Sequence, residues 1–259
     1  MAITIKTKEE IEILKEGGKI LAEVLKRISE FAKPGISTGF LNKKAREMIL
    51  ARGAEPAFEN YHPAFLKKPY PAALCTSLNE VVVHGLPSNK IILKEGDILK
   101  LDLGVKYKNL FTDAAVTIGI GKITDKNTKL INVTKRALEL AINEVKPGGH
   151  IGDIGYAVEN YVEREGMSVV KVLVGHGVGF AVHEEPNIPN YGKKGEGPEL
   201  RPGMVLAIEP MVTLGSEEVK LLKDGFGYET VDGSLSAHFE HTIAVTDNGY
   251  LLLTNLLLK

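Results

Sequence analysis

Acidic residues and histidines recur in the same order in the two halves of the chain. One apolar run ends in Asp102, and a second apolar run ends in Glu209, 107 positions later. His84 in Val-His-Gly is matched 99 positions later by His183 in Val-His-Glu. Matches in one order at a nearly constant offset indicate a duplicated structural unit. Because both halves contribute acids and histidines, we expect one shared site, and these residue types are typical metal ligands.

Asp102 and Asp113 flank a predicted β-hairpin. The turn-like segment Lys106–Asn109 is centred midway between them, so without a bulge the two aspartates would lie opposite each other on adjacent strands. Side chains in that position are roughly 4.5–5.5 Å apart at Cβ, and like charges at that separation destabilise a sheet. Two interpretations follow: an exposed pair on an edge hairpin, or a partly buried pair that needs a cation. The apolar neighbours favour the second, because buried charges must be paired or bound to metal.

Three further candidates lie in the second half of the chain. His176 follows an apolar run and stands between two glycines, which suits either a turn histidine or a ligand with space around its ring. Glu209 ends a strand next to a proline, a position typical of a ligand or of a cap. Glu240 shares one strand face with His238 and Thr242 if a single strand runs through all three.

These candidates amount to two Asp, two Glu and one to three His, without a cysteine ligand. Such a set suits hard or borderline divalent ions such as Co, Mn, Fe(II), Zn or Ni. Four carboxylates match two ions about 3.5–4 Å apart, bridged by carboxylates and a water, better than they match one ion with an open position. The implied reaction class is metal-assisted hydrolysis. A structural Ca²⁺ site is disfavoured by the histidines.

Composition restricts the class of protein. The 259 residues are 44% hydrophobic and 25% charged, as in soluble globular proteins with a full core. A net charge of −1 gives no basic surface for nucleic acid. Cys75 is the single cysteine, which excludes an internal disulfide framework and fits a reducing compartment. With no segment that resembles a signal peptide or a membrane span, we expect a cytoplasmic protein.

Each half of the chain reads as two helices followed by several strands. Thr7 and Glu10 form a capping box, and Pro34 follows the periodic apolar run that starts there. Further helices are predicted over residues 39–51, 124–144 and 151–165, and strands over Ile98–Val105, Val116–Ile120, Val169–Val174, Val205–Ile208 and Thr242–Val245. No flexible linker separates the halves, so we expect one α/β (α+β) domain over residues 1–259. Its internal repeat would comprise approximately residues 7–121 and 122–253.

The motifs of this chain resemble those of type I methionine aminopeptidases over nearly its whole length. The resemblance implies a pita-bread fold, in which a duplicated helix-helix-strands unit with a pseudo-twofold axis surrounds a central curved antiparallel sheet. Prolidases and aminopeptidase P share this fold. The motifs are Cys75-Thr-Ser-Leu-Asn79, Val83-His84-Gly, Leu101-Asp102-Leu-Gly, Thr112-Asp113, Gly175-His176-Gly, His183-Glu, Ile188-Pro-Asn-Tyr191, Ile208-Glu209-Pro-Met and Leu235-Ser-Ala-His-Phe-Glu240-His-Thr.

The resemblance implies five metal ligands. Asp102 would bind one ion, Asp113 and Glu240 would bridge both, and His176 and Glu209 would complete the shell of the other. A hydroxide that bridges the two ions would attack the carbonyl of the N-terminal methionine, with Glu209 as the proton acceptor.

Two histidines would complete the catalytic set. By resemblance, His183 would hydrogen-bond the scissile carbonyl oxygen or its oxyanion, and His84 would contact the scissile amide nitrogen and help to protonate the leaving amine. The family also places a monovalent cation near Asn79, Val81 and Ser236.

The methionine pocket resembles that of the family through Tyr70, Cys75 and Phe226. Two departures affect its selectivity. The segment Asn60–Pro69 lacks the usual tyrosine-and-glycine pattern, and we expect Phe65 to supply the missing ring. Val182 stands where the family often has an aromatic residue.

The resemblance implies removal of N-terminal methionine from nascent proteins and peptides with a small second residue. The enzyme would be monomeric and would act near the ribosome. The alternatives are an Xaa-Pro peptidase of the same fold, or a non-catalytic pita-bread protein that binds partners. Both are disfavoured: proline-specific enzymes usually carry an extra N-terminal domain, and inactive relatives typically lose ligands that are present here.

Overall fold

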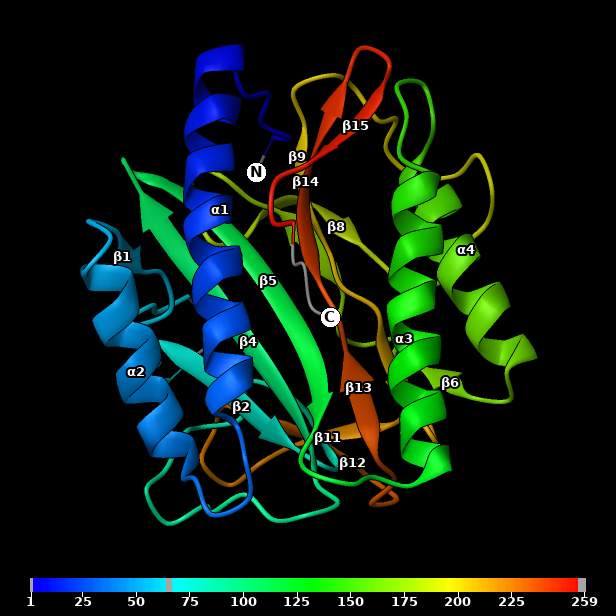
Figure 1. The fold of residues 1–259 in the computed structure, drawn as a ribbon. Helices are drawn as coiled ribbons and strands as arrows, with labels where there is room; N and C mark the ends of the chain where they lie inside the picture. Colours follow the sequence, from blue (N-terminus) through cyan, green and yellow to red (C-terminus); the bar gives the residue numbers. More distant parts are fainter. Residues whose placement is uncertain (1, 64–66, 256–259) are drawn as a thin grey trace.

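Helices pack against the sheets of the molecule (Figure 1). The computed structural model describes residues 2–63 and 67–255. Within these ranges the helices are α1 (Lys8–Phe31), α2 (Thr38–Leu50), α3 (Asp125–Asn143) and α4 (Ile151–Arg164). Each begins and ends within two residues of its predicted bounds, apart from α1, which stops three residues before Pro34.

The capping box predicted for α1 is present. Thr7 Oγ1 accepts a hydrogen bond from the backbone N–H of Glu10, and the Glu10 carboxylate accepts one from the N–H of Thr7. Leu14, Leu21 and Leu25 recur on one face of the helix and are fully buried. This face packs against the long hairpin of β4 and β5, so α1 covers the strands that carry both aspartates.

In the described part of the chain, all strand pairs are antiparallel and form four sheets. One sheet orders its strands β1-β4-β2 with β5 beside β4; the others are β13-β10-β6, β11-β12-β3 and β15-β14-β9-β7-β8. The bounds are β1 Glu55–Pro56, β2 Leu74–Leu78, β3 Val81–Val83, β4 Ile98–Tyr107, β5 Leu110–Gly119, β6 Ser168–Val169, β7 Gly175–Gly177, β8 Glu184–Ile188, β9 Val205–Ile208, β10 Met211–Thr213, β11 Val219–Leu221, β12 Tyr228–Thr230, β13 Ser236–His238, β14 His241–Thr246 and β15 Gly249–Leu252. This mixture of helices and antiparallel sheets confirms the predicted fold class.

The prediction of a strand over Val169–Val174 is wrong beyond its first residue. The backbone bends over residues 171–173, and β6 and β7 on either side of the bend belong to different sheets. An apolar run cannot distinguish one buried strand from a buried crossing between two sheets. The crossing matters because it places His176 in the five-stranded sheet, between β8 and β9.

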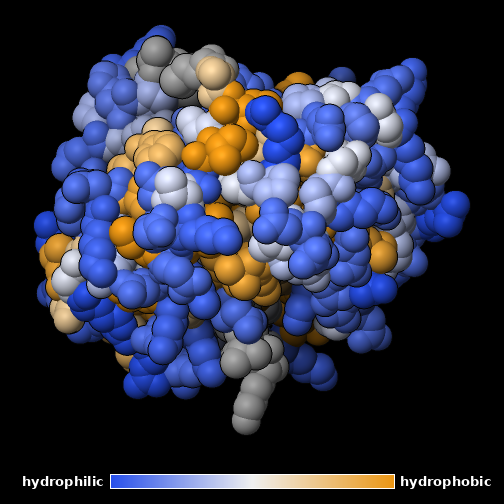
Figure 2. All heavy atoms as spheres, turned by 90° about the horizontal axis from the view of Figure 1, so that it is seen from above, coloured by the Kyte–Doolittle hydropathy of each residue, from blue (hydrophilic) through white to orange (hydrophobic). Residues whose placement is uncertain are grey.

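Seen from the end at which β15 lies, the surface is mostly hydrophilic, with apolar side chains gathered in a few patches (Figure 2). Among the residues that the structure describes, no helix is long and apolar enough to cross a membrane.

Candidate metal centre

Asp102 and Asp113 share one face of the β4–β5 hairpin but are not directly opposite each other. Asp102 is paired with Ala115, and Asp113 is paired with Gly104. The predicted register was wrong because the turn consists of Lys108 and Asn109, both with positive φ (47° and 65°). A two-residue turn of this kind shifts the centre of the hairpin by one residue. The aspartates are therefore diagonal neighbours, and both are buried.

His176 lies in β7, between β8 and β9, and is not a turn residue. Its glycine neighbours allow the strands to approach, because a Cβ on Gly175 would lie 2.5 Å from Ala207 O and one on Gly177 would lie 2.3 Å from Glu185 O. His176 Nδ1 is 2.9 Å from Gly177 O, so Nδ1 donates to that carbonyl. The lone pair of Nε2 is then free, 3.3 Å from Glu209 Oε1.

Glu240 does not lie in a continuous strand with His238 and Thr242. Phe239 and Glu240 separate β13 from β14, which belong to different sheets. The Glu240 N–H donates to Ala115 O at 2.9 Å, which fixes the acid beside β5. Thr242 Oγ1 accepts from the Asp113 N–H at 2.9 Å and donates to the Asp113 carbonyl at 2.7 Å. The interruption between β13 and β14 therefore leaves Glu240 held against β5, the strand that carries Asp113.

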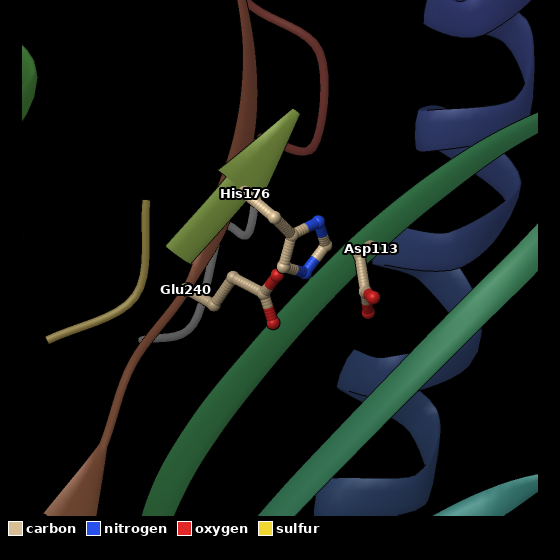
Figure 3. Close-up of side chains that lie close together, drawn as sticks. All are labelled: Asp113, His176 and Glu240. Carbon is tan, nitrogen blue, oxygen red and sulfur yellow. The ribbon is translucent and has the colours of Figure 1, made fainter. Parts of the chain in front are cut away.

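Three of the predicted ligands form a compact buried group. The donor atoms of Asp113, His176 and Glu240 lie within 4.8 Å of one another. Figure 3 shows their side chains converging from β5, β7 and the segment between β13 and β14. Asp102 and Glu209 line the same cavity. The fold thus brings all five predicted ligands together from residues up to 138 positions apart.

The donor set fits divalent metal. Asp102 Oδ1, Asp113 Oδ1 and Glu240 Oε1 are buried and have no hydrogen-bond partner among residues 2–63 and 67–255. Burial raises the pKa of Asp102 and of Glu209 to about 7. Burial, reinforced by the neighbouring carboxylates, raises the pKa of Asp113 and of Glu240 well above the ordinary value. A divalent cation would partner the orphaned oxygens and turn this repulsion into attraction.

Metal affinity is expected to rise steeply with pH. Since these carboxyl groups have raised pKa values, the metal-free protein retains protons at neutral pH, and the ion must displace them. Displacement of one proton strengthens binding about tenfold per pH unit below the pKa. Calorimetric titration with Mn²⁺ in buffers of different ionisation enthalpy measures both the affinity and the protons released. An affinity that is constant between about pH 6 and pH 8, without proton release, would contradict this account.

His183 is held by a partner that the sequence did not suggest. Tyr61 Oη lies 2.7 Å from His183 Nδ1, and the two rings are 5.3 Å apart. Burial raises the pKa of Tyr61 to about 12 and lowers the pKa of His183 to about 2. The tyrosine is therefore protonated and the imidazole neutral. Both residues border the cavity together with His84, whose φ is 58° and whose pKa burial lowers to about 4.

His238 is a second residue at the site that was not predicted to act there. It is 1% exposed, and its Nε2 lies 3.3 Å from Glu209 Oε2. With His176 Nε2 at the same distance from Oε1, the Glu209 carboxylate lies between two imidazoles. Burial lowers the pKa of His238 to about 4, so the ring is neutral. The sequence pattern predicted a single strand that places His238 and Glu240 on one face. It gave no reason to connect His238 with Glu209.

A cluster of apolar side chains contributes to the lining of the cavity. Tyr70, Cys75 and Phe226 belong to this cluster, and the Tyr70 and Phe226 rings meet edge to face at 5.4 Å. Phe58 also lines the cavity and was missed. Val182 is buried in the same cluster of side chains.

The segment Asn60–Pro69 is tied to the protein at its base. The N–H of Asn60 donates to Tyr70 O at 2.8 Å, and the N–H of Tyr70 donates to Tyr61 O at 2.9 Å. Phe65, the predicted source of the missing ring, lies outside the described residues. The rings of Tyr61 and Phe58 lie at the cavity in the described part of the chain.

The oxygens of the predicted monovalent-cation site lie close together. Ser236 Oγ is 3.3 Å from both Asn79 O and Val81 O. Lys100 Nζ lies among these residues, 2.6 Å from Asn79 O and 3.1 Å from Ser236 O. The residues present therefore do not fit a separate monovalent cation, because an ammonium group already contacts the oxygens that it would use.

Comparisons with known proteins agree with the geometry. The model of metallopeptidase family M24 matches residues 12–247. The methionine aminopeptidase of Aquifex aeolicus is 45% identical over 99% of this chain and 100% of its own length. Methionine aminopeptidase 1 of Bacillus subtilis is 44% identical over 97% of this chain and 99% of its own.

The fold agrees as well. The crystal structure of methionine aminopeptidase from Thermotoga maritima matches with a TM-score of 0.94 and 43% identity, covering 98% of this chain and 100% of that one. This match confirms the expected pita-bread fold. The chain therefore belongs to metallopeptidase family M24 and, within it, to the methionine aminopeptidases.

Proposed function

We propose that this protein removes the N-terminal methionine from proteins and peptides whose second residue is small. The observation that carries the proposal is one cavity lined by two kinds of side chain. Four carboxylates and three imidazoles line it, and so do aromatic rings and the Cys75 thiol. The carboxylates and imidazoles suit hydrolysis, and the aromatic rings and thiol offer the polarizable surroundings that a thioether prefers. The relatives named above support the same activity.

Asp102, Asp113, His176, Glu209 and Glu240 would hold two divalent ions, drawn from Co, Mn, Fe(II), Zn and Ni. Bound there, the ions would polarise the scissile carbonyl and make water a nucleophile near neutral pH. The aspartates and Glu240 contribute the orphaned oxygens, and Thr242 fixes the backbone of Asp113.

Glu209 is suited to accept the proton of the attacking water. Its pKa, raised by burial to about 7, matches what a general base needs near neutral pH. Its carboxylate lies between His176 and His238, at 3.3 Å from each, and Asn190 Nδ2 donates to its backbone carbonyl at 2.9 Å. These contacts restrain the position of the base.

His183 would donate a hydrogen bond to the carbonyl oxygen as negative charge develops on it. We assign the protonated Tyr61 hydroxyl as the donor to His183 Nδ1, which places the proton of the neutral imidazole on Nε2. An N–H donor with this preset orientation needs little reorganisation during the reaction. Tyr61 is thus a positioning residue for His183.

His84 would contact the scissile nitrogen. Its left-handed backbone conformation is uncommon for a residue other than glycine and is typical of strained functional positions. Its ring meets Tyr228 edge to face at 6.2 Å, which limits its rotation. With a pKa lowered to about 4, the imidazole is neutral and can exchange a proton with the leaving amine through one nitrogen.

The natural substrates in this proposal are nascent chains, which carry N-terminal methionine where they are synthesised. This argues for action in the cytoplasm near the ribosome. The family resemblance further implies a monomer. An Xaa-Pro peptidase is less well supported, since the full-length relatives named above are methionine aminopeptidases. A purely binding role is less well supported because no proposed ligand is missing.

Metal-dependent release of methionine tests the function. Chelator-treated protein is expected to release no methionine from Met-Ala-Ser, and added Co²⁺ or Mn²⁺ should restore release. Ala-Pro-Ala should stay intact under the same conditions. Cleavage of Ala-Pro-Ala would instead support the proline-specific alternative. No cleavage of either peptide by folded, metal-loaded protein would support the binding role.

A further inference from the structure

Lys100 lies on β4 between two buried leucines and is 1% exposed. A buried ammonium is costly unless hydrogen bonds satisfy it. Such a lysine in the interior therefore needs a structural explanation.

Uncharged oxygens surround the Lys100 ammonium. Nζ donates to Asn79 O at 2.6 Å, to Ser236 O at 3.1 Å and to Ser236 Oγ at 3.3 Å. Three donors on the ammonium meet three acceptors, and hydrogen bonds of this kind favour the protonated form. Carbonyl and hydroxyl oxygens are also the ligands that proteins offer to hard metal cations.

The contact joins three segments that carry the reaction site. Lys100 is two residues before Asp102, Ser236 is two residues before His238, and Asn79 forms the corner between β2 and β3. The corner is itself rigid. Asn79 Nδ2 donates to Asp97 Oδ1 at 3.0 Å, and Asn79 Oδ1 accepts from the Ile98 N–H at 3.0 Å.

We propose that Lys100 is a built-in monovalent cation. Its ammonium group takes the place of a bound potassium or sodium ion, holding the corner at Asn79 and strand β13 against β4. Lys100 is thereby a positioning residue for Asp102 and for the His238–Glu240 segment. The protein is consequently independent of free monovalent cations, because the charge is attached to its own chain.

Removal of the ammonium is expected to create the cation dependence that the wild-type protein lacks. Metal-free Lys100→Ala in tetramethylammonium chloride should unfold about 5–10 °C below the wild-type protein, because buried carbonyl oxygens lose their partner. Saturable addition of KCl, NaCl or NH₄Cl at constant ionic strength should restore most of this difference. Tetramethylammonium is too large to enter the cage and serves as the ionic-strength control. The wild-type melting temperature should be the same in all four salts.

Lys100→Met is the matched control, since it fills a similar space without a charge or a donor. We expect it to be destabilised and not rescued by any of the salts. A Lys100→Met protein as stable as wild type would show that the lysine only fills space. Wild-type stability that requires potassium or sodium would overturn the proposal directly, and this measurement remains decisive even if neither variant folds.

Activity provides a second readout, which rests on the proposed function. With saturating Mn²⁺ and in tetramethylammonium chloride, Lys100→Ala should lose about tenfold or more in kcat/KM for Met-Ala-Ser, because residues that orient metal ligands contribute about this much. Potassium should restore the lost activity. If these cations restore the stability of Lys100→Ala but the wild-type protein shows no activity, the proposed function is contradicted and the built-in cation is still supported. Activity in the wild type without cation rescue of Lys100→Ala would contradict the built-in cation alone.

Discussion

Asp113→Asn is expected to lower kcat/KM for Met-Ala-Ser by about 10³-fold or more, because a metal pair supplies several kcal/mol of transition-state stabilisation. Asp113 offers an orphaned carboxylate oxygen in the group with His176 and Glu240. An amide of nearly the same shape cannot bridge two cations with negative charge. Metal content after gel filtration should fall in parallel with activity.

The same substitution should not destabilise the metal-free protein. Asp113 is buried beside other carboxyl groups, and its raised pKa shows that the charged form is disfavoured there. Since the folded-state pKa lies above the unfolded value, this group costs stability progressively as the pH rises. Asp113→Asn removes that cost, so its metal-free melting temperature should equal or exceed that of wild type at about pH 8. Asp247→Asn, which changes an exposed carboxylate in the turn between β14 and β15, away from the site, is the control. Full metal binding by Asp113→Asn would contradict the assigned role.

His183→Ala is expected to lower kcat by about 10²–10³-fold with little change in KM, the usual effect of losing one donor to a developing oxyanion. The metal ligands remain, so metal binding should be unchanged. Tyr61→Phe leaves the imidazole in place but removes the donor to Nδ1, and the loss should be smaller, about 10-fold.

His150→Asn is the matched histidine control. His150 precedes α4, where Asn is a favourable helix cap, and it does not border the cavity. Its kinetics should match those of wild type. A His183→Ala enzyme with raised KM and unchanged kcat would show that His183 serves ground-state binding and not the transition state.

Local signals in the sequence predicted the helices well. Thr7 and Glu10 mark the start of α1 through hydrogen bonds within one turn, which depend on neighbouring residues alone. The β4–β5 hairpin was found but its centre was misplaced, because Lys108 and Asn109 adopt positive φ without a glycine to signal it. The bend after Val169 was missed because hydrophobicity reports burial and not the identity of the sheet.

The site residues that could be predicted are those that stand at the ends of apolar runs or at equivalent positions in the two halves of the chain. Tyr61 and His183 are 122 residues apart, and neither residue type predicts the other. His238 was noticed beside Glu240, but its contact with Glu209 arises only where β13 pairs with β10, the strand that follows Glu209. Lys100 sits in an apolar run like an outward-facing residue, and its three oxygen partners come from segments 21 and 136 positions away. Contacts of this range require the tertiary fold.

The bonds that fix Asp113 to Thr242 have a consequence for how the protein is made. They close a loop of 129 residues, and the Glu240–Ala115 bond closes one of 125. Asp102 and Asp113 are therefore synthesised well before Glu209, Glu240 and Thr242. The complete set of proposed ligands does not exist until residues 209–242 have been added, so the metal centre cannot be assembled before that segment leaves the ribosome.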